Sequence, residues 1–284
     1  MKLGIAGLLP HWNAIDLPAA QRVRQAGFRG ASIFFPKPLE AEQAHVARLR
    51  MILAEAGLEA AQANGWYEVL VHPDDAVRAE GVRGIQALCR LGRQIEAGSV
   101  YVRPGSLNPR GAWYPHPENH SPATFDRLID SLKAAARTAE QEGVLLALEG
   151  HVLSPLDSPQ RMRDALDAVG SPVLMVNMDP VNFIGSVGDV HDTTRVLTEL
   201  FDKLGQSIIA AHLKDCALED QLVLHIKEVL PGTGTLDYGL LLSRMQALKP
   251  DVYALIEHLP DEQVPQAREN VVRMAEKVKV ALVC

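Results

Sequence analysis

The chain has 284 residues, of which 47% are hydrophobic and 22% are charged. These values are ordinary for a globular protein with a large core. The net charge of −7 argues against a nucleic-acid-binding protein, because phosphate backbones select basic surfaces. No apolar run approaches the ~20 residues that cross a bilayer, the N-terminus has no signal-peptide cleavage site, and three cysteines are too few for a disulfide framework. We therefore expect a cytoplasmic protein with no nucleic-acid or membrane partner.

Short apolar runs and longer amphipathic segments alternate along the whole chain. The apolar runs predict strands at residues 2–6, 30–35, 58–64, 99–103, 144–149, 172–179, 207–212 and 252–257. The amphipathic segments predict helices at residues 16–26, 39–56, 73–96, 122–142, 159–169, 191–204, 237–248 and 261–282. Asp16 and Ser121 are expected as N-caps, and Gly143 as a C-terminal stop.

This alternation predicts an α/β fold, a single (β/α)8 TIM barrel over residues 1–284. Parallel strands need crossover helices, and eight such units close into a barrel with a filled interior. An open, doubly wound sheet is the alternative, and it is disfavoured because GLLPHWN after the first strand is no phosphate-binding fingerprint. Two long connections, 104–121 and 216–236, are expected as lids or pocket walls.

Each of the last four predicted strands ends in a residue that can bind a metal ion. These residues are Glu149, Asp179, His212 and Glu257. Taken singly, each of these residues could merely begin a solvated loop, and His212 could instead be a hydrogen-bonded core residue. Together they share one level at the carboxyl ends of neighbouring strands, where barrel active sites lie. Three carboxylates packed closely would repel one another without a cation, so the pattern predicts a divalent-metal site.

Three oxygen ligands and one imidazole suit a hard or borderline ion, with Mn²⁺ as the first choice and Mg²⁺, Co²⁺ or Zn²⁺ as alternatives. Four protein ligands leave open positions on an octahedral ion. A sugar ketone and its neighbouring hydroxyl could chelate there, and the ion would polarise the carbonyl and stabilise an enediolate.

Other residues near the same rim are candidates for substrate binding. They are Asn64, Arg103, Trp113, His151 and Lys214. An arginine fork can hold a carboxylate or phosphate, and an aromatic face can stack on a sugar. Structural alternatives stand beside each: an ion pair for Arg103, packing under a loop for Trp113, a backbone-bonded loop residue for His151, and pairing with Asp215 or a neighbouring carboxylate for Lys214.

Five segments make the chain resemble the xylose isomerase-like barrel superfamily, which includes sugar isomerases, ketose epimerases, a dehydratase and endonuclease IV. They are LALEGH (146–151), VNMDPVN (176–182), AHLKD (211–215), PGTGTLDY (231–238) and LIEHL (255–259). The resemblance covers nearly the whole chain. It implies the Glu–Asp–His–Glu metal set at the four strand ends, and it implies that Glu149 and Glu257 also act as catalytic acid and base.

The chain departs from the ketohexose 3-epimerases of that superfamily. Asn182 stands where they carry a histidine, and LKDCAL lacks their arginine; Asn182 is still expected to contact substrate. We expect a metal-dependent isomerase or epimerase of a small sugar, working through proton abstraction and an enediolate. A lyase or dehydratase acting on a keto-sugar or keto-glycoside is the alternative. An endonuclease IV-like nuclease is disfavoured by the charge and by a single-metal ligand set. A homo-oligomer is a further expectation, with the apolar segment 278–284 as its contact.

Overall fold

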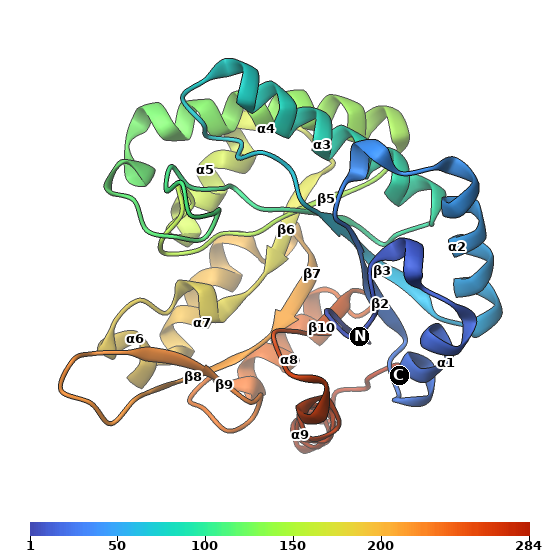
Figure 1. The fold of residues 1–284 in the computed structure, drawn as a ribbon. Helices are drawn as coiled ribbons and strands as arrows, with labels where there is room; N and C mark the ends of the chain where they lie inside the picture. Colours follow the sequence, from blue (N-terminus) through green and yellow to red (C-terminus); the bar gives the residue numbers. More distant parts are fainter.

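The computed structural model describes all residues, 1–284, and forms a closed parallel barrel (Figure 1). Its strands are β1 (Lys2–Ile5), β2 (Gly30–Phe35), β3 (Glu59–Gly65), β4 (Val100–Val102), β5 (Leu146–Leu148), β6 (Leu174–Met178), β7 (Ile208–Leu213) and β10 (Tyr253–Ile256). The barrel order is β1-β10-β7-β6-β5-β4-β3-β2. Because β1 pairs with both β10 and β2, the predicted TIM barrel is confirmed and the open sheet is excluded.

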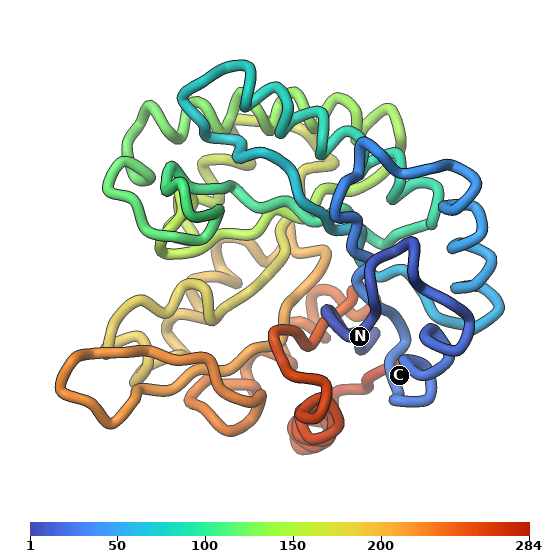
Figure 2. The backbone as a smooth tube through the Cα atoms, in the orientation of Figure 1, coloured from blue at the N-terminus to red at the C-terminus, as the bar shows by residue number.

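Helices surround the barrel (Figures 1 and 2). The longer ones bury apolar side chains along one face. They are α1 (Leu17–Gln25), α2 (Gln43–Ala56), α3 (Asp75–Gln94), α4 (Pro122–Glu142), α5 (Pro159–Val169), α6 (Val187–His191), α7 (Thr193–Leu204), α8 (Tyr238–Leu248) and α9 (Val264–Lys277). The ends of α4 follow the prediction: the Ser121 side chain accepts from the Thr124 N–H, and Gly143 adopts a left-handed conformation (φ 67°). None of the helices has the length and apolar character that a membrane crossing requires.

Three predicted helices differ from the structure. The segment predicted over 39–56 opens with a 3-10 turn, and α2 begins only at Gln43. Between α6 and α7, Asp192 leaves the helical conformation and caps α7 by accepting from the Arg195 N–H. The last helix was predicted to reach 282, but Lys279 adopts a positive φ of 58° and the chain then runs extended. Local capping and backbone conformation thus make these three helices shorter than the apolar periodicity predicted.

The C-terminal segment is hydrogen-bonded to the start of β1, at the amino end of the barrel. The Leu3 N–H donates to the Val283 carbonyl at 2.9 Å, and the Val283 N–H donates to the Met1 carbonyl at 2.8 Å. Val280 is buried there. The end of segment 278–284, which was expected to contact a partner copy, therefore lies beside the start of β1 of its own chain. The two termini lie close together (Figure 2).

The long connection after β7 contains a β-hairpin that was not predicted. β8 (Asp215–Leu218) pairs antiparallel with β9 (Ile226–Val229), and the hairpin extends away from the barrel (Figure 1). Asp215 anchors the segment that follows, because its carboxylate accepts the N–H groups of Gly232, Gly234 and Leu236 at 2.9 to 3.0 Å. A Cβ at Gly234 would lie 2.3 Å from the Asp215 carboxylate, so this close approach requires glycine.

Candidate metal centre

The four predicted ligands come together at the carboxyl ends of β5, β6, β7 and β10. His212 lies at the centre, with its Nδ1 2.9 Å from Glu149 Oε1, 3.1 Å from Glu257 Oε1 and 3.8 Å from Asp179 Oδ2. All four side chains are buried. Glu149, Asp179 and His212 each offer an atom within 4.8 Å of the others, close enough to share one ion. Glu257 stands outside this tighter set of three, although it contacts the same imidazole nitrogen.

Lys214 inserts its ammonium group among these ligands. Its Nζ lies 2.7 Å from Asp179 Oδ2 and 2.8 Å from Glu257 Oε1, and 3.4 Å from Asn182 Oδ1. Lys214 therefore pairs with the neighbouring carboxylates of Asp179 and Glu257. It does not pair with Asp215, whose carboxylate accepts backbone N–H groups of the following loop. The Lys214 ammonium group thus forms ion pairs with both Glu257 and Asp179.

The charges of this cluster shift one another's protonation. Burial raises the pKa values of Glu149 and Glu257, but His212 and Lys214 outweigh burial and hold both values below the usual range. Burial dominates at Asp179 and raises its pKa to about 6. Burial lowers the pKa of His212, yet Glu257 and Glu149 overcome this effect and raise it to about 10. The imidazole therefore carries a second proton at neutral pH whenever no metal ion is bound.

The donor atoms fit a divalent cation. Both Asp179 carboxylate oxygens and His212 Nδ1 are buried without a hydrogen bond of good geometry, although charged groups lie near them. Lys214 lies 2.7 Å from Asp179 Oδ2 and Glu149 lies 2.9 Å from His212 Nδ1, so Asp179 Oδ1 is the atom left without a partner. Buried polar atoms are nearly always satisfied, which makes this oxygen available to another ligand. Three carboxylates and one imidazole form a set that Mg²⁺ or Mn²⁺ accepts. Glu149, Asp179, His212 and Glu257 are the residues that would hold such an ion.

A second layer of polar residues supports the cluster from inside the barrel. The Tyr101 hydroxyl donates to Glu149 Oε2, and Asn177 Nδ2 donates to Glu149 Oε1 at 2.7 Å. Gln62 Nε2 donates to Asn177 Oδ1 at 3.0 Å. Sequence reasoning missed all three. Their signal was a polar side chain within a run of apolar strand residues, two positions before a strand-end candidate in each case: Gln62 before Asn64, Tyr101 before Arg103 and Asn177 before Asp179.

A cavity of about 600 Å³ opens beside this cluster at the mouth of the barrel. Asn64 and Glu257 both line it, together with Phe34 and His258. Asn64 thus lies at the mouth, as the sequence predicted, and Glu257 connects the buried ligand cluster to open space. The volume is sufficient for a small sugar, and the lining combines polar groups with an aromatic ring, as ligand pockets usually do.

The remaining predicted contacts lie around the carboxyl ends of β4, β5 and β6. The rings of Trp113 and His151 are 5.7 Å apart. His151 Nδ1 accepts from the Leu153 N–H, and burial with Lys214 nearby lowers its pKa to about 4, so the ring is neutral at pH 7. Asn182 donates through Nδ2 to the Gly150 carbonyl and turns its oxygen toward Lys214.

Arg103 is a buried cation without a carboxylate partner. Its Nη1 donates to the Gly65 carbonyl at 2.9 Å, and its guanidinium lies 4.9 Å from the Trp66 ring centroid and 4.2 Å from that of Tyr67. Only 5% of the residue is exposed. The structural ion pair considered for Arg103 is not formed; aromatic rings and a carbonyl stabilise its charge instead.

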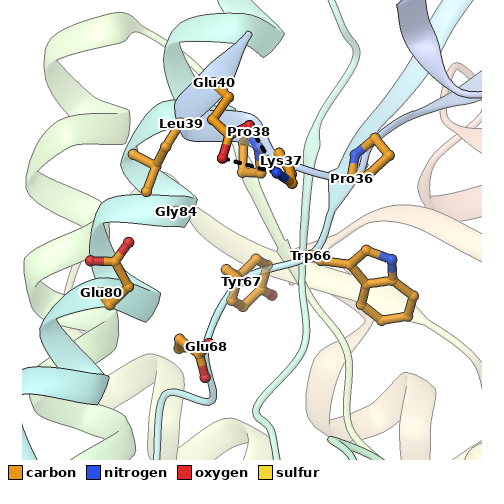
Figure 3. Close-up of a pocket in the computed structure, with 10 residues that line it drawn as sticks. All are labelled: Pro36, Lys37, Pro38, Leu39, Glu40, Trp66, Tyr67, Glu68, Glu80 and Gly84. Atoms are coloured by element: carbon orange, nitrogen blue, oxygen red, sulfur yellow. Dashed lines mark hydrogen bonds and ion pairs between the residues drawn. The ribbon is translucent and has the colours of Figure 1, made fainter.

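A separate cleft of about 280 Å³ lies between the loops after β2 and β3 (Figure 3). Trp66 lies across it from Glu80, and Lys37 pairs with Glu40 at its edge (Figure 3). None of the four proposed metal ligands lines it. Trp66 packs edge-on against Phe34 with centroids 5.3 Å apart, so this aromatic pair stands between the side cleft and the mouth cavity.

Comparison with known proteins identifies the family. The profile described as xylose isomerase-like TIM barrel matches residues 20–277. The chain therefore belongs to this family, as its sequence motifs indicated.

Solved structures share the fold at low sequence identity. A D-tagatose 3-epimerase-like protein aligns with a TM-score of 0.77 and 17% identity, covering 99% of this chain and 100% of its own. The 3-keto-D-glucoside 4-epimerase of E. coli gives 0.72 and 16%, covering 97% and 99%. A xylose isomerase-like protein of Mycobacterium smegmatis, in complex with magnesium, gives 0.75 and 16%, covering 98% and 96%. At these identities the likeness shows the fold alone. Curated protein sequences give no match.

Proposed function

We propose that the protein is a divalent-metal-dependent isomerase or epimerase of a small sugar or sugar derivative. One observation carries the proposal: three buried carboxylates surround one imidazole nitrogen, Nδ1 of His212, beside a mouth cavity of about 600 Å³. Structural relatives named as sugar epimerases support it. The ion that we propose is Mn²⁺, with Mg²⁺ next, since one relative was solved with magnesium.

The two glutamates differ in ways that suit different roles. Both oxygens of Glu149 are held by the protein, one by Asn177 and the other by Tyr101. Glu257 is held mainly through Oε1 by Lys214 and His212, and it lines the cavity. His212 and Lys214 outweigh burial and hold the pKa of Glu257 well below the usual range, so this carboxyl group is ionised at neutral pH and can accept a proton. We propose Glu257 as the base that removes a proton next to a carbonyl, and Glu149 as its partner acid or base.

The charge that develops on the substrate would be met by groups already in place. Proton removal beside a carbonyl gives an enediolate, and a bound divalent ion would supply Lewis-acid polarisation of that carbonyl. Lys214 adds a fixed ammonium beside Glu257. We propose that Asn64, Trp113, His151 and Asn182 orient the substrate. Arg103, with no carboxylate of its own, would favour a substrate that carries an anionic group.

A metal-dependent lyase or dehydratase is the second candidate, and one observation favours it. The Asn182 amide is committed to Gly150 and Lys214 and cannot exchange protons as a histidine could. Elimination beside a carbonyl also begins with proton abstraction, so the proposed base Glu257 could serve either reaction.

Incubation of the Mn²⁺-loaded protein in D2O with a panel of ketoses, aldoses and keto-sugars tests both candidates. Isomerisation or epimerisation places solvent deuterium on carbon in an isomeric product, whereas elimination gives a product lighter by water or an aglycone. Mass spectrometry and NMR distinguish them. If protein that binds Mn²⁺ catalyses neither a reaction nor C–H exchange across the panel, the proposed activity is wrong.

Glu257→Gln is the matching variant. It removes the proposed base but keeps an oxygen of similar geometry, so we expect turnover to fall by about 10²- to 10⁴-fold while the protein stays folded. Glu269→Gln changes an exposed glutamate of α9 in the same way and should leave turnover unchanged. Metal content is measured on both, because loss of the ion alone would also lower turnover.

A further inference from the structure

We propose that Gln62 and Asn177 form a hydrogen-bond relay that fixes the imidazole tautomer of His212 and thereby presents Nδ1 to the metal ion. These two amides are positioning residues, because they act only through Glu149 and His212. The inference depends on the proposed metal site and not on which reaction the site catalyses.

The relay crosses the interior of the barrel. Gln62 lies on β3 and Asn177 on β6, two strands that are not neighbours in the barrel. Gln62 and Asn177 are each 1% exposed, so water does not compete for their hydrogen bonds. The chain of contacts runs from Glu149 Oε1 to Asn177 at 2.7 Å, from Asn177 to Gln62 at 3.0 Å, and from Gln62 Oε1 to His212 Nε2 at 3.4 Å.

The direction of each hydrogen bond follows from the one before it. An ionised carboxylate only accepts, so Asn177 must turn its NH2 group toward Glu149. The Asn177 oxygen then faces Gln62, which must donate through its own NH2 group. This leaves the Gln62 carbonyl oxygen facing His212 Nε2. A carbonyl oxygen also only accepts, so Nε2 must carry the hydrogen.

This hydrogen decides which nitrogen can bind a metal. A neutral imidazole has one protonated and one unprotonated nitrogen. With the hydrogen held on Nε2, the lone pair lies on Nδ1, the atom that faces Glu149, Asp179 and Glu257. The separation of 3.4 Å is long for a hydrogen bond, but the structure gives Nε2 no other acceptor. Partners of this kind typically contribute a factor of 10 to 100 in metal affinity.

Titration of the metal-free protein with Mn²⁺ alone tests the relay. Gln62→Met keeps the volume and removes the acceptor, so Mn²⁺ affinity should fall by about 10- to 100-fold. Asn270→Leu is the control, because Asn270 is a buried amide whose hydrogen bonds go to Pro231, Gln266 and Arg273 and to no proposed ligand. It should destabilise the fold without weakening Mn²⁺ binding.

Two further measurements separate a relay from mere packing. If Gln62 and Asn177 act in series, Gln62→Met combined with Asn177→Leu should cost little more affinity than the larger single effect, whereas independent sites would add. In the Zn²⁺-loaded wild type, ¹⁵N NMR should show His212 Nε2 protonated and Nδ1 bound.

Several results would overturn the relay: an unchanged affinity in Gln62→Met, additive costs in the double variant, or Zn²⁺ bound through Nε2. A wild type that binds no Mn²⁺ would overturn the metal site together with the relay. Intact binding without turnover would overturn the proposed reaction alone.

Discussion

The protonation state of His212 determines the net charge of the ligand cluster. Three carboxylates face one imidazolium and the ammonium of Lys214, which leaves a deficit of one positive charge in the metal-free protein. Replacing the Nδ1 proton by a divalent ion would bring the cluster to neutrality. The two cations offset most of the repulsion among the three carboxylates, and a bound divalent ion would offset the rest.

Metal binding should release a proton from His212. Its pKa is raised to about 10 by Glu257 and Glu149 against the effect of burial, so at pH 7 to 9 the ring is doubly protonated and Nδ1 must lose its hydrogen to bind. Mn²⁺ affinity should rise with pH, by up to about tenfold per pH unit in that range. Below about pH 6, Asp179 also competes by protonation, and the dependence should steepen.

Calorimetry in two buffers of different ionisation enthalpy checks this at one pH. The apparent enthalpy of Mn²⁺ binding should differ between the buffers by the amount that one released proton predicts. Equal enthalpies, or an affinity that does not change between pH 7 and pH 9, would show that His212 is neutral before the metal arrives.

Candidate functional residues at the ends of strands were easier to predict from the sequence than those inside strands. Glu149, Asp179, His212 and Glu257 could be predicted because each ends an apolar run, where parallel strands share one rim. Gln62 and Asn177 lie inside their strands, and their importance depends on reaching each other across the barrel. No local pattern encodes the distance between β3 and β6, so only the closed structure brings these two amides together.

The elements after β7 show how one side chain can organise a segment. Asp215 accepts four backbone N–H groups, including that of Cys216, and so anchors the turn that leads into α8. The hairpin before this turn could not be predicted, because DCAL and IKEV are four residues each and show no clear alternation of polar and apolar residues. A loop and a short hairpin look alike in such a sequence.

Asp215→Ala should lower the free energy of unfolding by about 2 to 4 kcal/mol, because buried N–H groups lose their acceptor. Hydrogen exchange of the backbone amides over 230–236 should become faster. Asp202→Ala is the control, since Asp202 forms an exposed ion pair with Arg244, a kind of pair that contributes little to stability. Equal stability of the two variants in urea denaturation would contradict the anchoring role.

In the whole molecule, the proposed site and the contacts of the C-terminal segment lie at opposite ends of the barrel. The ligand cluster and mouth cavity lie at the carboxyl ends of the strands, whereas the C-terminal segment packs beside β1 at the amino end. The alternation of runs sufficed to predict the barrel, because eight strand–helix units have few other ways to pack. We propose that residues 1–284 act as one domain, since β1 and β10 close the barrel from the two ends of the chain. A homo-oligomer and a cytoplasmic location stay predictions.

Deletion of residues 280–284 tests this separation. The loss of buried Val280 and of two backbone hydrogen bonds beside β1 should cost about 2 to 5 kcal/mol and lower the melting temperature by several degrees. Mn²⁺ affinity at a temperature where both proteins are folded should remain within about twofold of the wild type. A large loss of metal affinity would mean that the two ends of the barrel are energetically linked.

Because the two termini lie close together, the order of the strand–helix units along the chain could be changed by circular permutation. A short linker could join Cys284 to Met1, and new ends could be opened at the solvent-exposed hairpin tip around Leu222. In such a circular permutant Glu257 would precede Glu149 along the chain, yet the same four side chains would meet at the same mouth. The arrangement of the four proposed ligands would then depend on the closed ring of strands and not on the order of the strands along the chain.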